Sequence, residues 1–467
     1  MHKDSNLKWQ IPLYTLGLST LALALFGRPV VNYLTDRLTK KIITNPYSEN
    51  LWELYTAGHR VGLQNITETN IRAQEGKVIN RPFGTPRKFP STDDLLFNFA
   101  QLNRLPTPGD YPIDMSVTIG PQAERPLTIK TPIMIAGMAY GLGLSEKAKI
   151  ALAQGATLAG TAFNNGEGPF LFSERKAAQK YILNYDRGFR NHNPEIIKKA
   201  DAIEIQFGQG ALGGTSYSTP YKNLPRKARK LLGLKPNEPC ITQARVPGII
   251  RPRRDLPQLV KRLKDITRGA PIGAKIAAGH ELELDLDILA DSEIDYIVVE
   301  GAQGATKGGP PILADDFGVP TLIAINRAAL YLREQGLDGK ISLVASGGLY
   351  NPGQFLKVLA LGADAVYIGT IALFGMSHTQ VLKVLPFEPP PSIVFADSKQ
   401  AWRFNTKKGS QSLYRFLKSC TEEMAGGVRA LGKTSLREVN RKDLRAISPY
   451  TAQALDLPLI SKSIFNI

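Results

Sequence analysis

Short apolar runs alternate with amphipathic stretches through the middle of the chain. The runs are five residues long and lie at Pro132–Ala136, Ala202–Gln206, Ile272–Ile276, Tyr296–Glu300, Ile341–Ala345 and Ala365–Gly369. Helical patterns occur between them, at Glu146–Leu158, Pro257–Arg268, Glu283–Ala290, Ala328–Gln335 and Pro352–Leu361. Such alternation is typical of a parallel sheet covered on both faces. At least six such units without a clear break favour a closed (β/α)8 TIM barrel over an open sheet.

The sequence on either side of these units is organised differently. Residues 31–110 form a predicted entry region, with a helical piece around Asn50–Ala57 and a proline-rich linker at Arg104–Gly109. Beyond the barrel, assigned to residues 111–385, a proline-rich link at Pro386–Pro391 leads into residues 386–467. Because helical patterns recur at Ser410–Ala425 and Ser435–Arg445, we predict a C-terminal helical extension packed on the barrel.

Residues 1–30 contain an uncharged stretch, Trp9–Gly27, with basic residues on both sides. A helix that spans a membrane needs about 20 apolar residues, so this stretch is just long enough. More basic residues follow it than precede it, which places the body of the protein on the cytoplasmic side. The sequence therefore predicts a membrane anchor with a cytoplasmic catalytic body. A buried helix stays open as an alternative, and so does a signal peptide, although no clear cleavage site follows.

The formal net charge is +17, and the basic residues are scattered with a few local clusters. Net charge informs about solubility and association rather than fold. A nucleic-acid-binding chain would place basic residues and exposed aromatic residues together on a recognisable module, and none is found. We interpret the clusters as solvated surface, with contact to anionic lipid as the alternative, and expect no nucleic-acid partner.

Cysteine is rare, with Cys240 and Cys420 far apart in the chain. Two such residues provide neither a disulfide framework nor the four thiolates of an iron–sulfur cluster. We therefore expect no iron–sulfur cluster and no metal site.

Glycine-rich segments follow the predicted strands. They are Gly137–Gly141, Ala162–Gly168, Phe207–Gly214, Glu300–Gly309, Ser346–Gly348 and Gly369–Thr370. In a barrel of this class, the loops after the strands build the active site. Glycine allows the backbone to approach a ligand closely and to direct N–H groups at it. This position of the glycines favours a ligand site at one end of the barrel over a merely loop-rich chain.

Two of these segments predict a phosphate site, and one lysine lies near it. Gly347 and Gly348, then Gly369 and Thr370, end consecutive strands where barrels of this class bind phosphate. Lys275 ends the strand Ile272–Ile276, where a cation would stabilise the negative charge of a reduced flavin. The alternative for Lys275 is a structural ion pair with Glu204 or Glu300.

Taken together, these motifs resemble the FMN-binding synthase domain of glutamate synthases, and most closely its short relatives without the glutaminase part. The residues that carry the resemblance are Gly137–Met138, Asn164–Gly168, Ile203–Ile205, Gln209–Ala211, Lys275, Gly301–Pro310 and Gly347–Thr370. The resemblance covers roughly 110–376 and extends more weakly to residues 81–85 and 422–432.

The resemblance implies FMN at the barrel mouth and reduction of an imino acid formed from 2-oxoglutarate and ammonia. Lys275 and Glu204 would act in catalysis, with Glu204 relaying a proton. As the alternative, Glu204 and Glu167 satisfy buried amides or pair with Lys275. The cofactor contacts that the resemblance implies are Met138, Ala139, Asn164, Gln209, Lys275, Gly304, Gly347, Gly348, Gly369 and Thr370.

The chain departs from the family pattern at several positions. The family carries its cluster cysteines in the stretch that matches Ile371–Val384, and none occurs here. Leu212 and Gln206 replace two lysines of the family, Ser346 replaces an aspartate, and Arg245–Gly248 replaces a Pro-His-His segment. No nucleophilic cysteine stands at the N-terminus of this sequence, so we expect no glutamine hydrolysis.

These features together predict an FMN-dependent oxidoreductase of the glutamate-synthase type. The expected substrate is a small 2-oxo acid or amino acid, and the resemblance suggests glutamate and 2-oxoglutarate. The electron donor is unknown. One alternative is an FMN-dependent isomerase or 2-hydroxy-acid oxidase. The oxidase normally needs a histidine base, and His280 alone of the five histidines lies near the expected barrel mouth. The other alternative is a non-catalytic flavin-binding scaffold.

Overall fold

The computed structural model describes residues 26–462, which divide into two compact units, one up to Ile79 and one from Asn80 onward. In the first unit, residues 26–43 are helical, and α2 (Glu53–Val61) and α3 (Leu63–Glu75) follow. Gly62 separates α2 from α3 with a φ of 88°, which only glycine adopts easily. Large apolar side chains, including Trp52 and Leu54, are exposed on this unit.

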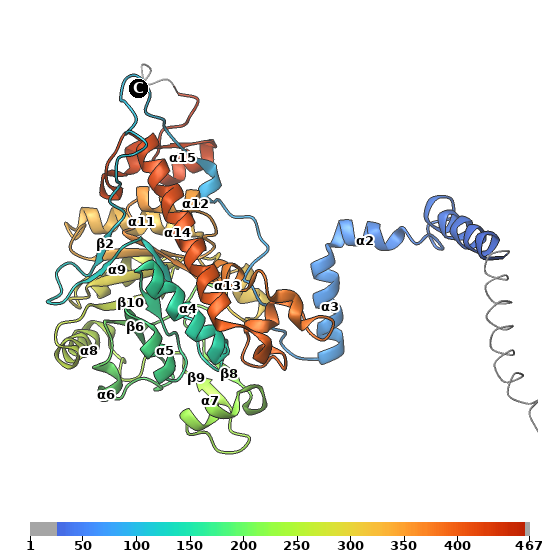
Figure 1. The fold of residues 1–467 in the computed structure, drawn as a ribbon, viewed down its shortest axis with the longest axis horizontal. Coiled ribbons are helices and arrows are strands. Elements are labelled where there is room, and N and C mark those ends of the chain that lie inside the picture. The colour runs from blue at the N-terminus through green and yellow to red at the C-terminus, as the bar shows by residue number, and fades with distance from the viewer. Residues whose placement is uncertain (1–25, 463–467) are drawn as a thin grey trace, which may run out of the picture. The chain divides into compact units, whose positions relative to one another are not determined.

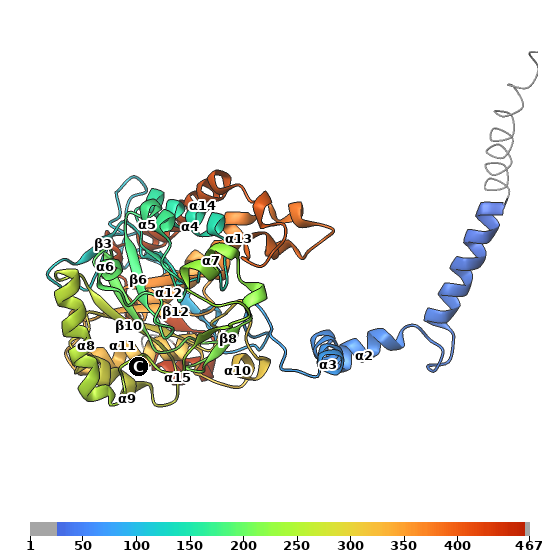
Figure 2. The ribbon, with the colours of Figure 1, turned by 90° about the horizontal axis from the view of Figure 1, so that it is seen from below.

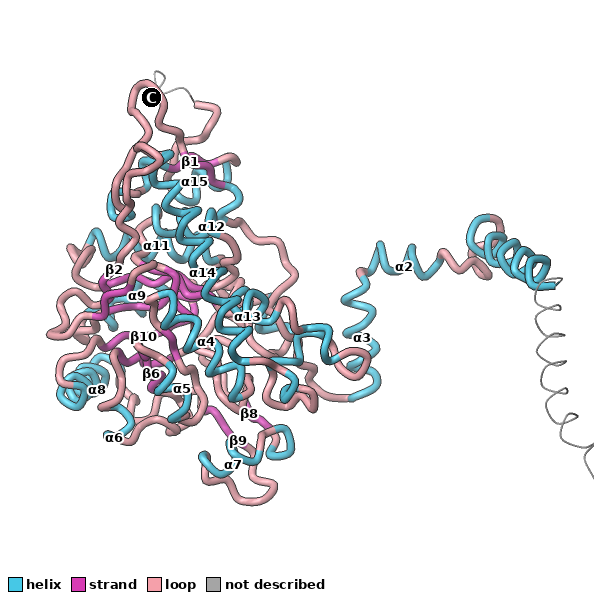
Figure 3. The backbone as a smooth tube through the Cα atoms, in the orientation of Figure 1, coloured by secondary structure: helices cyan, strands magenta, loops and turns pink. Residues whose placement is uncertain are grey.

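The second unit is built on a closed barrel of eight parallel strands, which confirms the predicted fold class. Figure 3 shows the strands of this unit in magenta, with the helices in cyan around them. In chain order the strands are β4 (Ile133–Ile135), β5 (Phe163–Asn164), β6 (Tyr181–Tyr185), β7 (Ala202–Gln206), β10 (Ile272–Ala277), β11 (Tyr296–Glu300), β12 (Ser342–Ser346) and β13 (Ala365–Ile368).

Apolar and β-branched residues dominate these strands because both of their faces are buried. Every residue of β4 and β11 is buried, for example. The barrel closes where β13 pairs with β4, with Val366 opposite Ile133 and Ile368 opposite Ile135. All carboxyl ends of the strands therefore lie at one end of the barrel.

Helices surround the barrel, and the C-terminal helix α14 (Thr406–Ala430) completes their ring. α14 packs on α4, α12 and α13, and Figure 1 and Figure 2 both show it beside α4. The other helices are α4 (Glu146–Ala159), α5 (Phe172–Ala177), α6 (Pro194–Ile197), α7 (Arg226–Leu231), α8 (Pro252–Thr267), α9 (Leu282–Ala290), α10 (Pro311–Asp315), α11 (Thr321–Glu334), α12 (Pro352–Ala360), α13 (Thr370–Ser377) and α15 (Pro449–Leu455).

Three short antiparallel strand pairs lie outside the barrel. β2 (Val117–Ile119) and β3 (Leu127–Ile129) precede it and contact the amino ends of its strands, because the Gly120 N–H donates to Ser342 Oγ at the start of β12. β1 (Leu95–Phe97) pairs with β14 (Leu444–Ala446), and β8 (Tyr217–Thr219) pairs with β9 (Cys240–Thr242) in the excursion that follows β7.

The C-terminal extension differs from its prediction in one segment. Ser410–Ala425 lies within α14 as expected, but Ser435–Arg445 is not a continuous α-helix. It consists of 3-10 turns at Leu436–Glu438 and Arg441–Asp443, followed by β14. Ser435 and Asn440 each cap the following turn with their side chains. Each cap begins a separate short turn, so no single helix runs through the segment.

The predicted membrane anchor, Trp9–Gly27, lies outside the described residues except for Phe26 and Gly27. Among residues 26–462, no helix combines the length and the apolar character needed to cross a membrane. The described structure thus gives no support to the anchor, which stays a prediction.

Candidate functional site

A cavity of about 420 Å³ opens at the carboxyl ends of the barrel strands. This volume falls within the usual range of small-molecule and cofactor sites, roughly 300–1,000 Å³. Eight of the ten predicted cofactor-binding residues line it: Met138, Ala139, Gln209, Lys275, Gly347, Gly348, Gly369 and Thr370. The other two, Asn164 and Gly304, and the predicted catalytic Glu204 do not.

The first wall of the cavity, which we call the glycine wall, is made by Gly347–Gly348 after β12 and Gly369–Thr370 at the start of α13. Gly347 and Gly348 have φ angles of 107° and 66°, which disfavour any side chain. No side chain caps α13, and a Cβ built on Gly369 meets no atom within 4 Å. The N-terminal N–H groups of α13 therefore remain available to an anion.

The loop of residues 137–139 continues this backbone surface. Its three residues follow β4, are partly accessible, and line the cavity. Their N–H groups donate no hydrogen bond within the described residues. A Cβ on Gly166 would lie 2.6 Å from the Met138 nitrogen, so this glycine allows the neighbouring loop to pack closely.

Asn164 supports this loop from behind instead of lining the cavity. It is fully buried, its Oδ1 accepts the Gly166 N–H at 2.8 Å, and its Nδ2 donates to the Tyr367 hydroxyl at 3.2 Å. Gly304 also supports the site from behind, packed against the side chain of Glu300. Both residues lie next to the cavity lining, and their contact with a cofactor stays a prediction.

Lys275 lies in the cavity and forms an ion pair. Its Nζ is 2.9 Å from Glu300 Oε2, which also accepts the Gly210 N–H at 3.1 Å. Ser346 Oγ donates to the other oxygen of Glu300 at 3.1 Å. Burial alone would favour the neutral amine, but the carboxylates of Glu300 and Glu204 raise the pKa of Lys275. The lysine is therefore held as a cation at the cavity.

Glu204 lies one layer deeper in the barrel. It is fully buried, and its Oε2 accepts the hydroxyl of Tyr367 at 2.9 Å, while Asn184 donates to its Oε1 at 3.3 Å. Burial raises the pKa of Glu204, with the charge of Lys275 opposing the shift. Tyr367 lines the cavity and Glu204 does not, so the Tyr367 hydroxyl lies between Glu204 and the cavity.

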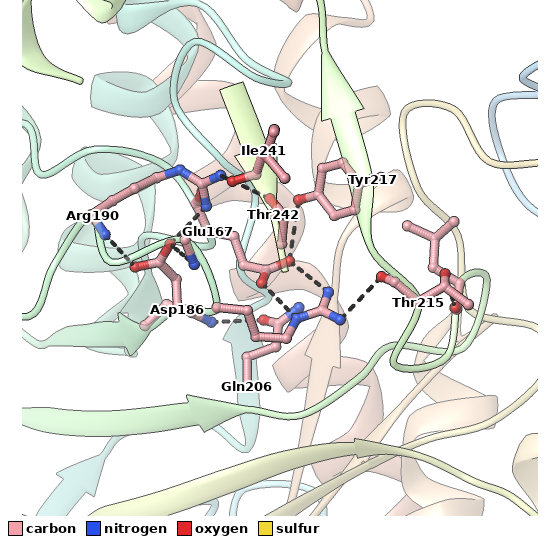
Figure 4. A network of polar contacts seen from close by, with 12 residues as sticks. Glu167, Asp186, Arg190, Gln206, Thr215, Tyr217, Ile241 and Thr242 are labelled. Carbon is pink, nitrogen blue, oxygen red and sulfur yellow. Dashed lines mark hydrogen bonds and ion pairs between the residues drawn. The ribbon is translucent and has the colours of Figure 1, made fainter. Parts of the chain in front are cut away.

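A buried network of charged residues borders the cavity on another side (Figure 4). Glu167 lines the cavity and accepts from Arg187 Nε at 3.1 Å and from the Tyr217 hydroxyl at 3.2 Å. Arg190 donates to the Glu167 carbonyl at 2.9 Å and pairs with Asp186 at 2.6 Å. Glu167 belongs to the sequence motif Asn164–Gly168, whereas its partners on β8 and in the segment after β6 lie in no motif.

Lys307 and Asp397 form the third ion pair at the cavity. Both side chains line it, their charged groups are 2.6 Å apart, and each is about one-third exposed. Lys307 lies in the loop after β11, and Asp397 lies about 90 residues later, beyond α13. Sequence spacing gives no signal of such a pair, although the glycine-rich loop around Lys307 was recognised.

The two substituted family positions also face the cavity. Gln206, at the end of β7, accepts a hydrogen bond from Asn184 at 2.7 Å, and Leu212 is almost fully buried; both line the cavity. Among the described residues that line the cavity, the basic ones are Lys275 and Lys307, and the acidic ones are Glu167, Glu300 and Asp397. Both lysines are already paired, so the cavity offers little unpaired positive charge from side chains.

The family model described as the conserved region in glutamate synthase matches residues 97–434. The chain is 32% identical to a glutamate synthase large subunit-like protein of Rhizobium meliloti over 85% of this chain and 94% of that protein. It is 28% identical to an archaeal-type glutamate synthase [NADPH] of Thermotoga maritima over 84% of this chain and 81% of that one. Its fold is similar to that of a flavocytochrome b2 variant, with a TM-score of 0.50 and 16% identity over 80% and 81% of the two chains. These matches show, in agreement with the barrel and the cavity at its strand ends, that the chain belongs to the glutamate synthase family.

Proposed function

We propose that the protein is an FMN-dependent oxidoreductase of the glutamate-synthase type. The observation that carries the proposal is the glycine wall, because a phosphate group fits where backbone N–H groups are free and side chains are absent. The open space in front of Gly369 is consistent with this fit. The cavity volume of about 420 Å³ is also adequate for a flavin mononucleotide.

In this proposal each wall has its own task. Gly347, Gly348, Gly369 and Thr370 hold the phosphate, and the N–H groups of residues 137–139 face the flavin ring. When bound, FMN supplies hydride transfer. Lys275 places a positive charge beside the ring, and Glu300 fixes the position of that charge. The Tyr367 hydroxyl, backed by Glu204, holds a proton at the cavity surface.

For the substrate we propose a small 2-oxo acid or amino acid that carries less negative charge than 2-oxoglutarate. Gln206 and Leu212 occupy the two positions where the family has lysines, and both cavity lysines are paired with carboxylates. A dicarboxylate would therefore meet no unpaired cation from the described lining residues. The sequence lacks cysteines between Ile371 and Val384, so we propose that a diffusing donor or a docked partner reduces the flavin.

Two other functions fit the described structure less well. The histidine base of a 2-hydroxy-acid oxidase would have to come from His280, which is exposed and does not line the cavity. A non-catalytic flavin scaffold would leave the buried pairs at Lys275 and Glu204 without a chemical task. Attachment to the cytoplasmic face of a membrane belongs to the proposal as well, and rests on the sequence of residues 9–27 alone.

The visible spectrum of the purified protein tests the cofactor. We expect flavin absorption, and release of FMN rather than FAD on heat denaturation. A colourless protein that also fails to bind added FMN would overturn the proposal. Reductants and 2-oxo acids screened against the bound flavin then separate an enzyme from a scaffold, because only an enzyme shows turnover.

A further inference from the structure

Lys149 is a fully buried lysine on α4 that reaches two of the loops at the cavity. Its Nζ donates to the carbonyl of Met138 and, at 2.9 Å, to the carbonyl of Asn165. It also lies 3.3 Å from Glu174 Oε2 and 4.5 Å from the centre of the Phe163 ring. Lys149 does not line the cavity, so it acts on these loops from behind.

The contacts of Lys149 match those of a protonated amine. The Lys149 Nζ donates to two carbonyl oxygens, and Glu174 Oε2 lies at ion-pair distance without a hydrogen bond of its own. A neutral amine could also serve the two carbonyls, so the nearby carboxylate of Glu174 is the contact that favours the charged form. Burial lowers the pKa of Lys149 and raises that of Glu174, and the attraction between the two charges opposes both shifts. The Tyr181 hydroxyl, which donates to Glu174 at 3.0 Å, supports the carboxylate further.

The hydrogen bond to Met138 fixes the direction of the next N–H group. The peptide between Met138 and Ala139 is trans, since the described residues contain one cis bond and it precedes Pro386. In a trans peptide the C=O and the following N–H point in opposite directions. Because Lys149 holds the Met138 carbonyl from outside, the Ala139 N–H points away from Lys149 and toward the cavity that Ala139 lines.

The Ala139 N–H has no hydrogen-bond acceptor within the described residues. A cation on the carbonyl of the same peptide polarises it and strengthens the N–H as a donor, since hydrogen bonds in series reinforce one another. We propose that Lys149 is a positioning residue, which directs and strengthens the Ala139 N–H as a donor to the flavin ring and thereby favours the reduced, negatively charged flavin. This inference rests on the proposed FMN site.

The test compares the reduction potential of bound FMN in three proteins. The first is the wild type, and the second carries Lys149→Met with Glu174→Gln, so that no buried charge is left unpaired. The third carries Lys433→Met with Asp443→Asn, which likewise leaves no buried charge unpaired, and is the matched control. Lys433 is also a largely buried lysine that pairs with a carboxylate, Asp443, and donates to a backbone carbonyl, that of Glu438, but it does not line or support the cavity.

We expect the Lys149→Met and Glu174→Gln protein to bind reduced FMN at least tenfold more weakly, relative to oxidised FMN, than the wild type does. A tenfold change corresponds to about 30 mV toward negative potential for a two-electron couple. The control with Lys433→Met and Asp443→Asn should keep the wild-type potential, even if its melting temperature falls.

Each result decides the inference. Equal potentials in all three flavin-loaded proteins overturn it and leave the proposed function standing. A wild-type protein that binds no FMN overturns both. Should the double variant not fold, Lys149→Gln retains a neutral donor, and we expect a smaller shift in the same direction; an unchanged potential in that variant overturns the inference as well.

Discussion

Two parts of the same cavity are built by different means. The glycine wall, residues 347–348 and 369–370, presents backbone N–H groups and almost no side chains. A second part, which we call the charged wall, is built from side chains: the ion pairs Lys275–Glu300, Glu167–Arg187 and Lys307–Asp397, together with Gln206 and Leu212. The glycine wall is suited to a phosphate, which many barrels bind at this position, whereas we expect the charged wall to determine which substrate enters.

This difference has a consequence for variation within the family. A backbone site tolerates changes in neighbouring side chains, because its donors belong to the main chain. A wall of side chains changes its preference with single substitutions, and the sequence resemblance implies that Gln206 and Leu212, which line the cavity, are such substitutions. We therefore expect cofactor binding to resemble that of the relatives and the substrate to differ.

The largest effect should come from filling the glycine wall. In Gly369→Leu the new side chain enters space where nothing lies within 4 Å of its Cβ, so the fold is undisturbed and the phosphate is displaced. We expect FMN affinity to fall more than a hundredfold, because two or more charged hydrogen bonds at about 1.5–3 kcal/mol each are lost. Titration of the apoprotein followed by flavin fluorescence measures this loss.

Gly279→Leu is the matched control, because its Cβ also meets nothing within 4 Å and it does not line the cavity. Gly348 is a poorer choice, since a Cβ there would lie 2.4 Å from Gln303 Cβ and would disturb the loop itself. Normal FMN binding by Gly369→Leu would contradict the phosphate site.

The charged wall can be altered separately by returning Gln206 and Leu212 to lysine. Each restored charged hydrogen bond should strengthen binding of 2-oxoglutarate by about 1.5–3 kcal/mol, or roughly tenfold to a hundredfold. Calorimetric titration with 2-oxoglutarate measures this gain, and pyruvate, which has a single carboxylate, should gain less. If the wild type already binds 2-oxoglutarate tightly and forms glutamate from it efficiently, our account of the charged wall is wrong.

A smaller effect concerns the strands that carry the glycine wall. Asp364 Oδ2 accepts the Leu343 N–H at 2.8 Å and so ties β13 to β12, while burial raises the pKa of Asp364 to about 6. The folded state therefore binds the proton more tightly than the unfolded state, and stability falls as pH rises from about 4 to 6.

Replacement of Asp364 by asparagine removes this titration. We expect Asp364→Asn to be about 1–3 kcal/mol more stable than the wild type above pH 6, and the difference should shrink toward pH 4. Urea unfolding at several pH values gives the comparison. A constant difference across this range would show that Asp364 does not titrate as described, while the cofactor site would be unaffected.

The smallest effect on the cavity is expected from removal of the N-terminal residues. A chain that begins at Thr44 should keep its FMN absorption unchanged, because residues 137–370 supply the described cavity contacts that we assign to the flavin. If the predicted anchor is correct, the protein with residues 1–43 sediments with membranes and the shortened chain does not. Full-length protein in the soluble fraction would favour the buried-helix alternative for Trp9–Gly27.

The strands and the glycine wall were predictable from sequence because their signals are local. Apolar runs of five residues predicted six of the strands. β5 has only two residues, and Tyr181–Tyr185 contains a buried polar residue, Asn184, so neither strand was predicted. The ion pairs of the charged wall join residues 20 to 90 positions apart, and only the closed barrel brings them together. Lys149 was not predicted for a related reason. Its side chain is fully buried, but nothing in the sequence distinguishes it from an exposed lysine of α4.

The most direct test of the central claim compares the affinities of the apoprotein for FMN and for riboflavin, which lacks only the phosphate. If the glycine wall binds the phosphate, FMN should bind more than a hundredfold more tightly than riboflavin, and Gly369→Leu should abolish that difference. Equal affinity of the wild type for the two flavins would contradict the account, because the glycine wall would then contribute nothing to cofactor binding.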